Sequence, residues 1–317
     1  NVLVGGPGAE DVPMLFGSWS YMWQGTEPGA YPDGVATFAE AMQRADLAGV
    51  TILPDGVYEP DRVRAHGYGA DVAVLALGEK PSVEKPGDIE TLELPRDQVA
   101  LVRDLAESGV SVVVVLYQNR PRLVRQIEPM VDAIVLAYQP GPYGGPAVAD
   151  VLTGRFNPTG HLPFTYPRLD GSLVPYDHKR SDEGDILHGW SAVQPQFPFG
   201  HGLSYTSFEY SDLATDVTDF EDEGIVRAMV TITNTGEMAG GDAVLLFVRD
   251  HVASVTPSVR RLRAFETVDL EPGESTTVSF DLNRDAFSFI GRDLRQVMEP
   301  GAFSIFVDDL EAVIELP

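Results

Sequence analysis

A loop rich in carboxyl groups is the first place where this sequence could carry out chemistry. Glu79, Glu84, Asp88 and Glu90 follow the apolar run Val72–Leu77 in a stretch punctuated by Pro and Gly. Ligands of open α/β sheets bind beyond the carboxyl ends of the strands. Partial burial and like-charged neighbours can raise the pKa of a carboxyl group, as a general acid working near neutral pH requires. The alternative is a solvated acidic loop on an acidic protein.

An aromatic segment, Gly17–Gly25, is the second candidate. It contains Trp19 and Trp23, two of the three Trp residues of the chain, together with Tyr21. Aromatic rings can stack on the apolar faces of sugars, and a polar side chain such as Gln24 can bind sugar hydroxyl groups. The segment therefore favours a carbohydrate-binding loop. Buried Trp residues that anchor the loop in its own domain would give the same pattern.

The composition argues against several other kinds of function. With 48 acidic residues against 22 Lys and Arg, the 317-residue chain has a net charge of −26, which disfavours nucleic-acid backbones and anionic membranes as partners. There is no Cys, and the six His are scattered. We expect neither a metal nor another cofactor. No apolar run approaches the ~18 residues of a membrane span, and no signal peptide is visible. Because the chain enters a strand almost at once, we expect a piece of a longer protein.

Two sequence patterns predict the strands and helices that must position these residues. Up to residue 207, apolar runs alternate with amphipathic segments, which predicts a doubly wound, mostly parallel α/β sheet with helices on both faces. The predicted strands are Val2–Val4, Val50–Leu53, Val72–Leu77, Val110–Leu116 and Ala133–Ala137, and the predicted helices are Val35–Ala45, Arg96–Ser108 and Ala147–Leu152. Within this part, residues 161–207 are rich in Pro, Gly and aromatic residues and predict an ordered strap packed across a surface. Residues 208–317 predict an immunoglobulin-like sandwich of roughly seven strands.

Several motifs, in order along the chain, resemble the C-terminal half of glycoside hydrolase family 3 enzymes of the β-glucosidase and exo-β-glucanase branch. They include the aromatic segment Gly17–Gly25, the acidic loop Gly78–Asp88, the turn Asn157–Gly160 and the signature Phe197–Tyr205. Leu94, Pro95 and Gln98 match the helix after the acidic loop, Arg120 and Pro121 match the next strand end, and residues 140–152 match the crossover that follows. Residues 234–265 resemble the fibronectin type III-like domain of that family. The resemblance covers essentially the whole chain. One departure is Tyr143, which stands where the family often has Glu.

The resemblance implies a retaining β-glycosidase that hydrolyses terminal β-D-glucosyl residues of β-glucosides or β-glucan oligosaccharides. Such enzymes use a nucleophile and an acid/base residue whose carboxyl groups lie about 5–5.5 Å apart. By resemblance, Glu84 is the acid/base residue and Trp23 is the platform for the leaving-group sugar. Trp19 matches the motif and either lines the site or packs beneath it. Glu79 and Asp88 are expected to shape the loop.

The nucleophile of the family is an Asp on a preceding (β/α)8 barrel, which these 317 residues do not include. The expected partners are therefore that barrel and a β-linked glucoside or oligosaccharide, and a homo-oligomer is an open possibility. We also expect a secreted or periplasmic protein. Two alternatives stay open: a β-xylosidase or xyloglucan-directed enzyme of the same family, and a non-catalytic carbohydrate-binding module. The presence of Glu84 at the matching position favours an enzyme over a module.

Overall fold

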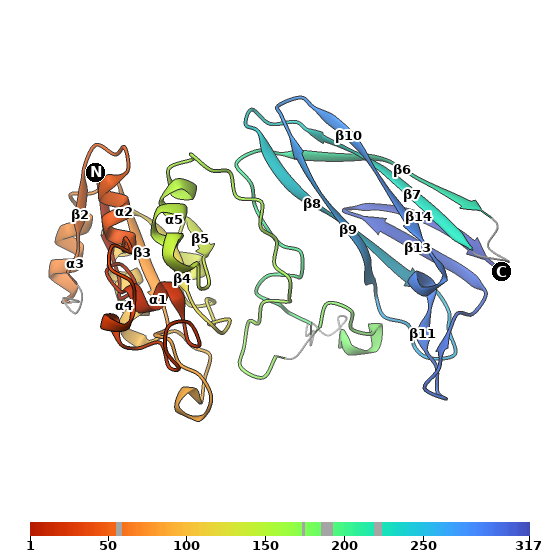
Figure 1. The fold of residues 1–317 in the computed structure, drawn as a ribbon, viewed down its shortest axis with the longest axis horizontal. Helices are drawn as coiled ribbons and strands as arrows, with labels where there is room; N and C mark the ends of the chain where they lie inside the picture. Colours follow the sequence, from red (N-terminus) through yellow and green to blue (C-terminus); the bar gives the residue numbers. More distant parts are fainter. Residues whose placement is uncertain (55–58, 173–174, 185–192, 219–223) are drawn as a thin grey trace. The chain divides into compact units, whose positions relative to one another are not determined.

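The chain divides into two compact units, shown in the computed structural model of Figure 1. The structure describes residues 1–54, 59–172, 175–184, 193–218 and 224–317. The first unit contains Asn1–Phe156 and Pro167–Ser172. The second contains Asn157–Tyr166 and the described residues from 175 onward. The chain therefore enters the second unit, returns to the first and enters the second again.

A five-stranded sheet forms the frame of the first unit. Its strands are β1 (Val2–Gly5), β2 (Val50–Ile52), β3 (Val72–Gly78), β4 (Ser111–Tyr117) and β5 (Ala133–Leu136). Their order is β2-β1-β3-β4-β5, and all neighbours are parallel. The prediction of a parallel sheet from five apolar runs is confirmed. Because β2 and β3 flank β1 on opposite sides, the chain changes direction across the sheet between β1 and β3, which is where open α/β sheets bind ligands.

Five α-helices accompany this sheet in the described residues. They are α1 (Val12–Phe16), α2 (Phe38–Arg44), α3 (Pro60–Gly67), α4 (Arg96–Glu107) and α5 (Gly144–Leu152), with short 3₁₀ turns η1 (Pro28–Ala30), η2 (Lys85–Gly87), η3 (Glu128–Met130) and η4 (Gly141–Tyr143). The predicted helices correspond to α2, α4 and α5. Helices α1 and α3 are additions that the sequence patterns did not predict. Helix α2 begins at a capping box in which Thr37 and Glu40 each bind the other's backbone N–H, an arrangement that satisfies two otherwise free donors.

The helices cover both faces of the sheet. Helices α2 and α5 contact each other and bury Phe38 and Val148 against a face that includes Val4 and Val74. The alternate strand residues, such as the fully buried Leu75, point to the other face. There α4 packs on β3 and β4 and contacts α3. Each large apolar side chain buried in this way contributes about 1.5–3 kcal/mol, so the sheet is a firm base for the loops at its edge.

The second unit is an antiparallel β-sandwich. One sheet has the order β10-β7-β6, the other has the order β14-β13-β8-β9, and β11 pairs with β12. The strands are β6 (Phe208–Thr218), β7 (Ile225–Asn234), β8 (Gly240–Asp250), β9 (Arg261–Leu270), β10 (Ser275–Leu282), β11 (Phe289–Ile290), β12 (Gln296–Val297), β13 (Gly301–Val307) and β14 (Leu310–Leu316), with the turns η5 (Arg180–Asp182) and η7 (Arg284–Phe287). Alternate residues of β7 are fully buried between the sheets, and the predicted sandwich is confirmed.

Parts of the predicted strap contact the sandwich. Nε2 of His161 lies 2.7 Å from Oδ1 of Asp242 on β8, and its Nδ1 lies 2.8 Å from the carbonyl oxygen of Gly200. The Asn157 side chain donates to the carbonyl oxygen of Ala239 at 3.0 Å. These polar contacts fix the segment 157–166 to the second unit. Strap residues 173–174 and 185–192 lie outside the described residues.

Candidate active site

The loops that could carry chemistry lie side by side at the carboxyl edge of the parallel sheet. Strand β3 pairs with β1 on one side and β4 on the other. The aromatic segment Gly17–Gly25 follows β1 and α1, the acidic loop follows β3, and Arg120 and Arg122 follow β4. The two segments that the sequence proposed for chemistry therefore project from one edge, beside the point where the strand order reverses.

Gly78 ends β3 in a conformation that requires glycine. Its φ is 132°, and a Cβ atom there would lie 1.8 Å from the carbonyl oxygen of Tyr117. The side chain of Gln98, on α4, accepts from the N–H of Gly78 and donates to its carbonyl oxygen, both at 2.9 Å. These contacts fix the direction in which the chain leaves the sheet and enters the acidic loop.

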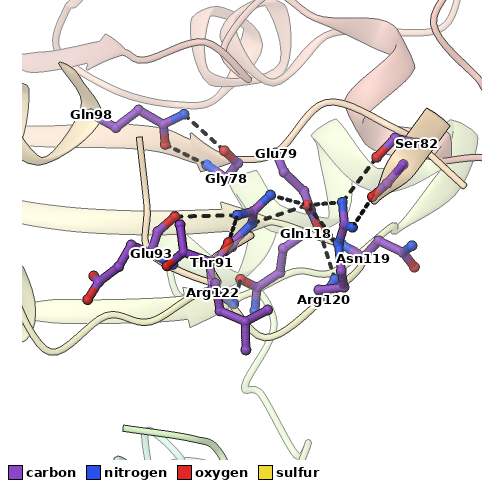
Figure 2. Close-up of polar contacts among 12 residues, drawn as sticks. Gly78, Glu79, Ser82, Thr91, Glu93, Gln98, Gln118, Asn119, Arg120 and Arg122 are labelled. Carbon is purple, nitrogen blue, oxygen red and sulfur yellow. Dashed lines mark hydrogen bonds and ion pairs between the residues drawn. The ribbon is translucent and has the colours of Figure 1, made fainter. Parts of the chain in front are cut away.

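Glu79, the next residue, is a buried carboxylate held by the strand-end residues of β4 (Figure 2). Its Oε1 accepts from the backbone N–H groups of Asn119 and Arg120, at 3.0 and 2.8 Å. Its Oε2 forms ion pairs with Nη2 of Arg120 at 2.7 Å and Nη2 of Arg122 at 2.5 Å. Burial alone would raise the pKa of Glu79, but the hydrogen bonds from Arg120 and the charge of Arg122 outweigh it and lower this pKa. Glu79 is therefore ionised near neutral pH and unsuited to donate a proton.

Arg120 also connects the two ends of the turn that contains Glu84. Nη2 of Arg120 donates to Oγ of Ser82 at 3.0 Å, and Nη1 donates to the carbonyl oxygen of Gly87 at 2.5 Å. The two sides of the loop touch, since a Cβ atom on Gly87 would lie 2.9 Å from the carbonyl carbon of Ser82. Across the turn, the N–H of Gly87 donates to the carbonyl oxygen of Glu84 at 2.8 Å. Glu84 thus occupies the tip of a short, closed turn.

The Glu84 side chain is exposed, and its backbone conformation is unusual. Its φ is 56° and its ψ is −153°, a region that residues with a Cβ atom rarely adopt and that is enriched at functional sites. Among the described residues, its carboxyl group makes no hydrogen bond or ion pair. Glu84 and Glu79 therefore differ in kind: the Glu84 carboxyl group is exposed, whereas the Glu79 carboxylate is buried and paired with two Arg. Asp88 and Glu90 are also exposed.

The aromatic segment presents both of its Trp rings to solvent. Trp19 is 65% exposed and Trp23 is 46% exposed, so buried Trp anchors do not explain this segment. The ring centroids lie 6.4 Å apart, and the N–H of Trp19, at φ 57°, donates to the carbonyl oxygen of Trp23 at 3.0 Å. The buried Tyr31 anchors the segment instead, because its hydroxyl donates to the carbonyl oxygen of Gly25 at 2.8 Å and its ring packs on Phe16.

A side-chain amide joins the aromatic segment to the acidic loop. Nε2 of Gln24 donates to the carbonyl oxygen of Val83 at 3.0 Å, and Oε1 accepts from the N–H of Val83 at 3.1 Å. Gly25 packs against Pro81 at the same place, where an added Cβ atom would lie 3.0 Å away. The structure therefore brings Trp19, Trp23 and Glu84 onto two connected loops.

An open hollow of about 640 Å³ lies at this edge of the sheet. Its walls include Pro7, Met14, Lys80, Ser82, Arg120 and Arg122. Glu79 also lines it, whereas Glu84, Trp19 and Trp23 do not. These three residues are exposed on the two connected loops.

The sequence patterns do not reveal the residues that hold these loops together. The sequence favours Gln24 as a ligand of sugar hydroxyl groups, and the structure shows that its amide binds the backbone of Val83. The role of Arg122 was not predicted, and Arg120 was not assigned to the acidic loop. A signal was present, because two Arg at alternate positions directly after a buried strand are unusual in a chain so poor in basic residues. In the described part of the chain, no group of three His, Asp or Glu is arranged to hold a metal, and no helix is long and apolar enough to span a membrane.

Comparison with known proteins gives two family matches. Residues 1–205 match the glycosyl hydrolase family 3 C-terminal domain, and residues 242–310 match a fibronectin type III-like domain. A lysosomal beta glucosidase of Dictyostelium discoideum is 37% identical over 97% of this chain and 39% of its own length. A beta-xylosidase of Formosa agariphila is 36% identical over 80% of this chain and 36% of its own length.

Solved structures agree with these matches. A crystal structure of a beta-glucosidase from Listeria innocua superposes on the whole of this chain with a TM-score of 0.86 and 29% sequence identity, and the match covers 45% of that chain. The present chain thus spans less than half the length of the relatives that it matches. The two consecutive family matches lead to one assignment: the chain belongs to glycosyl hydrolase family 3, as its C-terminal domain followed by a fibronectin type III-like domain.

Proposed function

We propose that this chain supplies Glu84 as the general acid/base of a retaining β-glycosidase that releases terminal β-D-glucosyl residues from β-glucosides or β-glucan oligosaccharides. The observation that carries the proposal is the contrast between two carboxyl groups of one loop. Glu79 is buried and paired with two Arg, whereas Glu84 is exposed at the tip of the turn and next to a residue bound by the aromatic segment. Double displacement needs a group that donates a proton and then accepts one, which suits Glu84 alone of the two.

The nucleophile would be an Asp on a preceding (β/α)8 barrel. It would attack the anomeric carbon while the protonated Glu84 gives its proton to the departing glycosidic oxygen. The Glu84 carboxylate would then remove a proton from water as that water attacks the glycosyl–enzyme bond, which restores both groups. The outward-facing position of Glu84 supports this division, since an acid/base residue that faces a second domain must lie on the surface of its own.

Trp23 would stack on the sugar that carries the leaving oxygen. Its exposed ring lies in the segment that Gln24 ties to the loop of Glu84, and stacking on an aromatic face suits a pyranose ring. Trp19 would form the second aromatic surface beside it, because the two rings lie 6.4 Å apart. Asp88 and Glu79 would keep the loop in shape, Glu79 through Arg120.

The choice of sugar rests on the relatives. Proteins described as beta-glucosidases favour a glucosyl substrate, and the similarity to a beta-xylosidase keeps a xylosyl substrate as the second candidate. Comparing kcat/KM for p-nitrophenyl β-D-glucoside and p-nitrophenyl β-D-xyloside separates them, because the leaving group is the same. We expect the glucoside to be preferred, and a preference for the xyloside would overturn this part of the proposal.

The acid/base assignment is tested with Glu84→Ala in the enzyme that carries this chain and its barrel. Loss of the proton donor should slow the hydrolysis of a β-linked disaccharide by roughly 10²–10⁴-fold, and much less that of a 2,4-dinitrophenyl glucoside, whose leaving group needs no proton. Azide should restore turnover of the activated substrate and yield a glycosyl azide. Glu90→Ala, an exposed carboxyl of the same loop, is the control. An unchanged disaccharide rate would reject the assignment, and sugar binding without hydrolysis in the unaltered enzyme would indicate a binding module.

We further propose that the protein acts outside the cytoplasm, as a secreted or periplasmic enzyme. A relative from Salmonella typhimurium is described as a periplasmic beta-glucosidase, and it is 33% identical over 75% of this chain and 32% of its own length. Fractionation of the source cells, with activity followed in the medium, the periplasm and the cytoplasm, tests this. Activity confined to the cytoplasm would contradict it.

A further inference from the structure

The turn that presents Glu84 is held from two opposite sides by residues of other loops. Gln24, in the aromatic segment, binds the N–H and the carbonyl oxygen of Val83. Arg120, after β4, binds the side chain of Ser82 before Glu84 and the carbonyl oxygen of Gly87 after it. The residues before and after Glu84 are therefore held by hydrogen bonds from other loops. The side chain of Glu84 takes no part in these bonds.

Arg120 is itself held by a buried network of ion pairs and hydrogen bonds. Its guanidinium is bound by Glu79, whose side chain is 5% exposed and which also receives two backbone N–H groups and the charge of Arg122. A guanidinium has five N–H donors in a fixed plane, so contacts with Glu79 orient the donors that reach Ser82 and Gly87. Figure 2 shows this arrangement, with Arg120 between Glu79 and Ser82.

The backbone conformation of Glu84 explains why these contacts matter. A φ of 56° is unfavourable for a residue with a Cβ atom, and such conformations persist when the surrounding structure determines them. If the contacts of Val83, Ser82 and Gly87 were released, Glu84 could rotate towards an ordinary negative φ. Its carboxyl group would then point in another direction.

We propose that Arg120 and Gln24 are positioning residues that set the direction of the Glu84 carboxyl group by clamping the turn on either side of it. The inference rests on the proposed acid/base role of Glu84. It assigns to two residues outside the acidic loop a specific effect on proton transfer, distinct from a general effect on folding. A displacement of about 1 Å at a catalytic group can cost about 10²-fold in rate, so small changes in the turn are measurable.

The predicted signature is a dependence on the leaving group. Because kcat/KM reports the step that forms the glycosyl–enzyme, a misplaced acid affects a substrate that needs protonation and spares one that does not. We expect Gln24→Met and Arg120→Met to lower kcat/KM for a β-linked disaccharide by about 10–100-fold, and to lower that for the 2,4-dinitrophenyl glycoside by no more than about 3-fold. A change that merely reduces the folded fraction would lower both equally.

The experiment uses the enzyme that carries this chain and its barrel, with two further variants. Arg125→Met, which removes an exposed ion pair with Glu93 outside the turn, is the matched control and should leave the ratio of the two kcat/KM values unchanged. Gln24→Met is also combined with Glu84→Ala. If Gln24 acts through Glu84, adding Gln24→Met to Glu84→Ala should alter the disaccharide rate by less than about 2-fold.

The outcomes separate this inference from the proposed function. Equal losses on both substrates, or a full further loss in the Glu84→Ala background, would overturn the clamp while leaving the acid/base role intact. If Glu84→Ala itself shows no dependence on the leaving group, the acid/base role fails first. Arg120→Met removes a partner of the buried Glu79 and can unfold the protein. In that case Gln24→Met, whose side chain has a similar length and no charge to leave unpaired, decides the matter alone.

Discussion

The side-chain amide of Gln24 forms two hydrogen bonds with the backbone of Val83, although the residues lie 59 positions apart in the sequence. Trp23 directly precedes Gln24, and Glu84 directly follows Val83. One amide thus connects the aromatic platform and the proposed proton donor through their nearest neighbours. Under the proposed function both groups would contact the same sugar, and a contact that involves neither of their side chains connects their loops.

We predict that Trp23→Ala weakens oligosaccharide binding by about 1–3 kcal/mol, because an exposed aromatic ring that stacks on a sugar is lost. Binding is measured calorimetrically in a Glu84→Ala background, so that the ligand is not consumed. Trp19→Ala, measured in parallel, shows whether the second ring contacts the ligand. Unchanged affinity in Trp23→Ala would remove this ring from the site.

We predict that Glu79→Gln lowers the free energy of unfolding by about 3–5 kcal/mol, because it leaves two partly buried guanidinium groups without their shared carboxylate. The 25% exposure of the Arg120 side chain favours the lower end of this range. Asp150→Asn, which removes an exposed ion pair with Arg155, should cost no more than about 1 kcal/mol. Urea unfolding of both variants measures the difference, and equal costs would show that the Glu79 network is not structural.

We predict that His161 stabilises the fold more at low pH than at high pH. The hydrogen bond to Asp242 raises the pKa of His161, although burial opposes it. Both ring nitrogens face oxygens that can accept, the Oδ1 of Asp242 and the carbonyl oxygen of Gly200, so the doubly protonated ring satisfies both. The stabilisation is therefore complete below the ordinary pKa of 6.5 and is lost as the pH rises through the higher pKa of the folded state.

His161→Gln removes this titration and provides the measurement. The unfolding free energy of the unaltered protein minus that of His161→Gln, followed from about pH 5 to about pH 9, should decrease as the pH rises. A difference that grows with pH would mean that the folded protein prefers the neutral ring. A constant difference would mean that the pKa of His161 is the same in the folded and unfolded states.

We predict that Glu84→Gly is more stable than Glu84→Ala by about 1 kcal/mol. The φ of 56° at this position costs about 1–3 kcal/mol for a residue with a Cβ atom, and relief of that cost exceeds the ~0.5–1 kcal/mol that Gly loses in entropy. At Glu90, which does not have a positive φ, Gly should be the less stable of the two. The same order of Gly and Ala at both positions would contradict strain at Glu84.

The parallel sheet and the β-sandwich could be predicted from the sequence because each strand leaves a local pattern of apolar residues. Runs such as Val72–Leu77 are buried on both faces, and alternation along β7 reports its one buried face. Helix α1 could not be found in this way, because the five residues Val12–Phe16 are too few to show a helical period. Helix α3 is mostly polar and buries only Val63 and Gly67.

The internal order of the site could not be predicted, because it depends on contacts between distant segments. Four acidic residues in one loop look alike in the sequence, and only the pairing of β3 with β4 brings Arg120 and Arg122 to Glu79. Likewise, Gln24 reaches Val83 only because β1 and β3 are neighbours. The family resemblance identified Glu84 and Trp23 as site candidates, and the structure adds the contacts that hold their loops.

The path of the chain between the two units limits how such proteins can recombine. Residues 157–166 belong with the sandwich through His161 and Asn157, yet residues 167–172 belong to the unit that carries the parallel sheet. No single cut in the backbone therefore separates the two units, and a splice at residue 207 would leave Asp242 without its histidine. An exchange of the sandwich between relatives would therefore have to include the stretch that begins at Asn157.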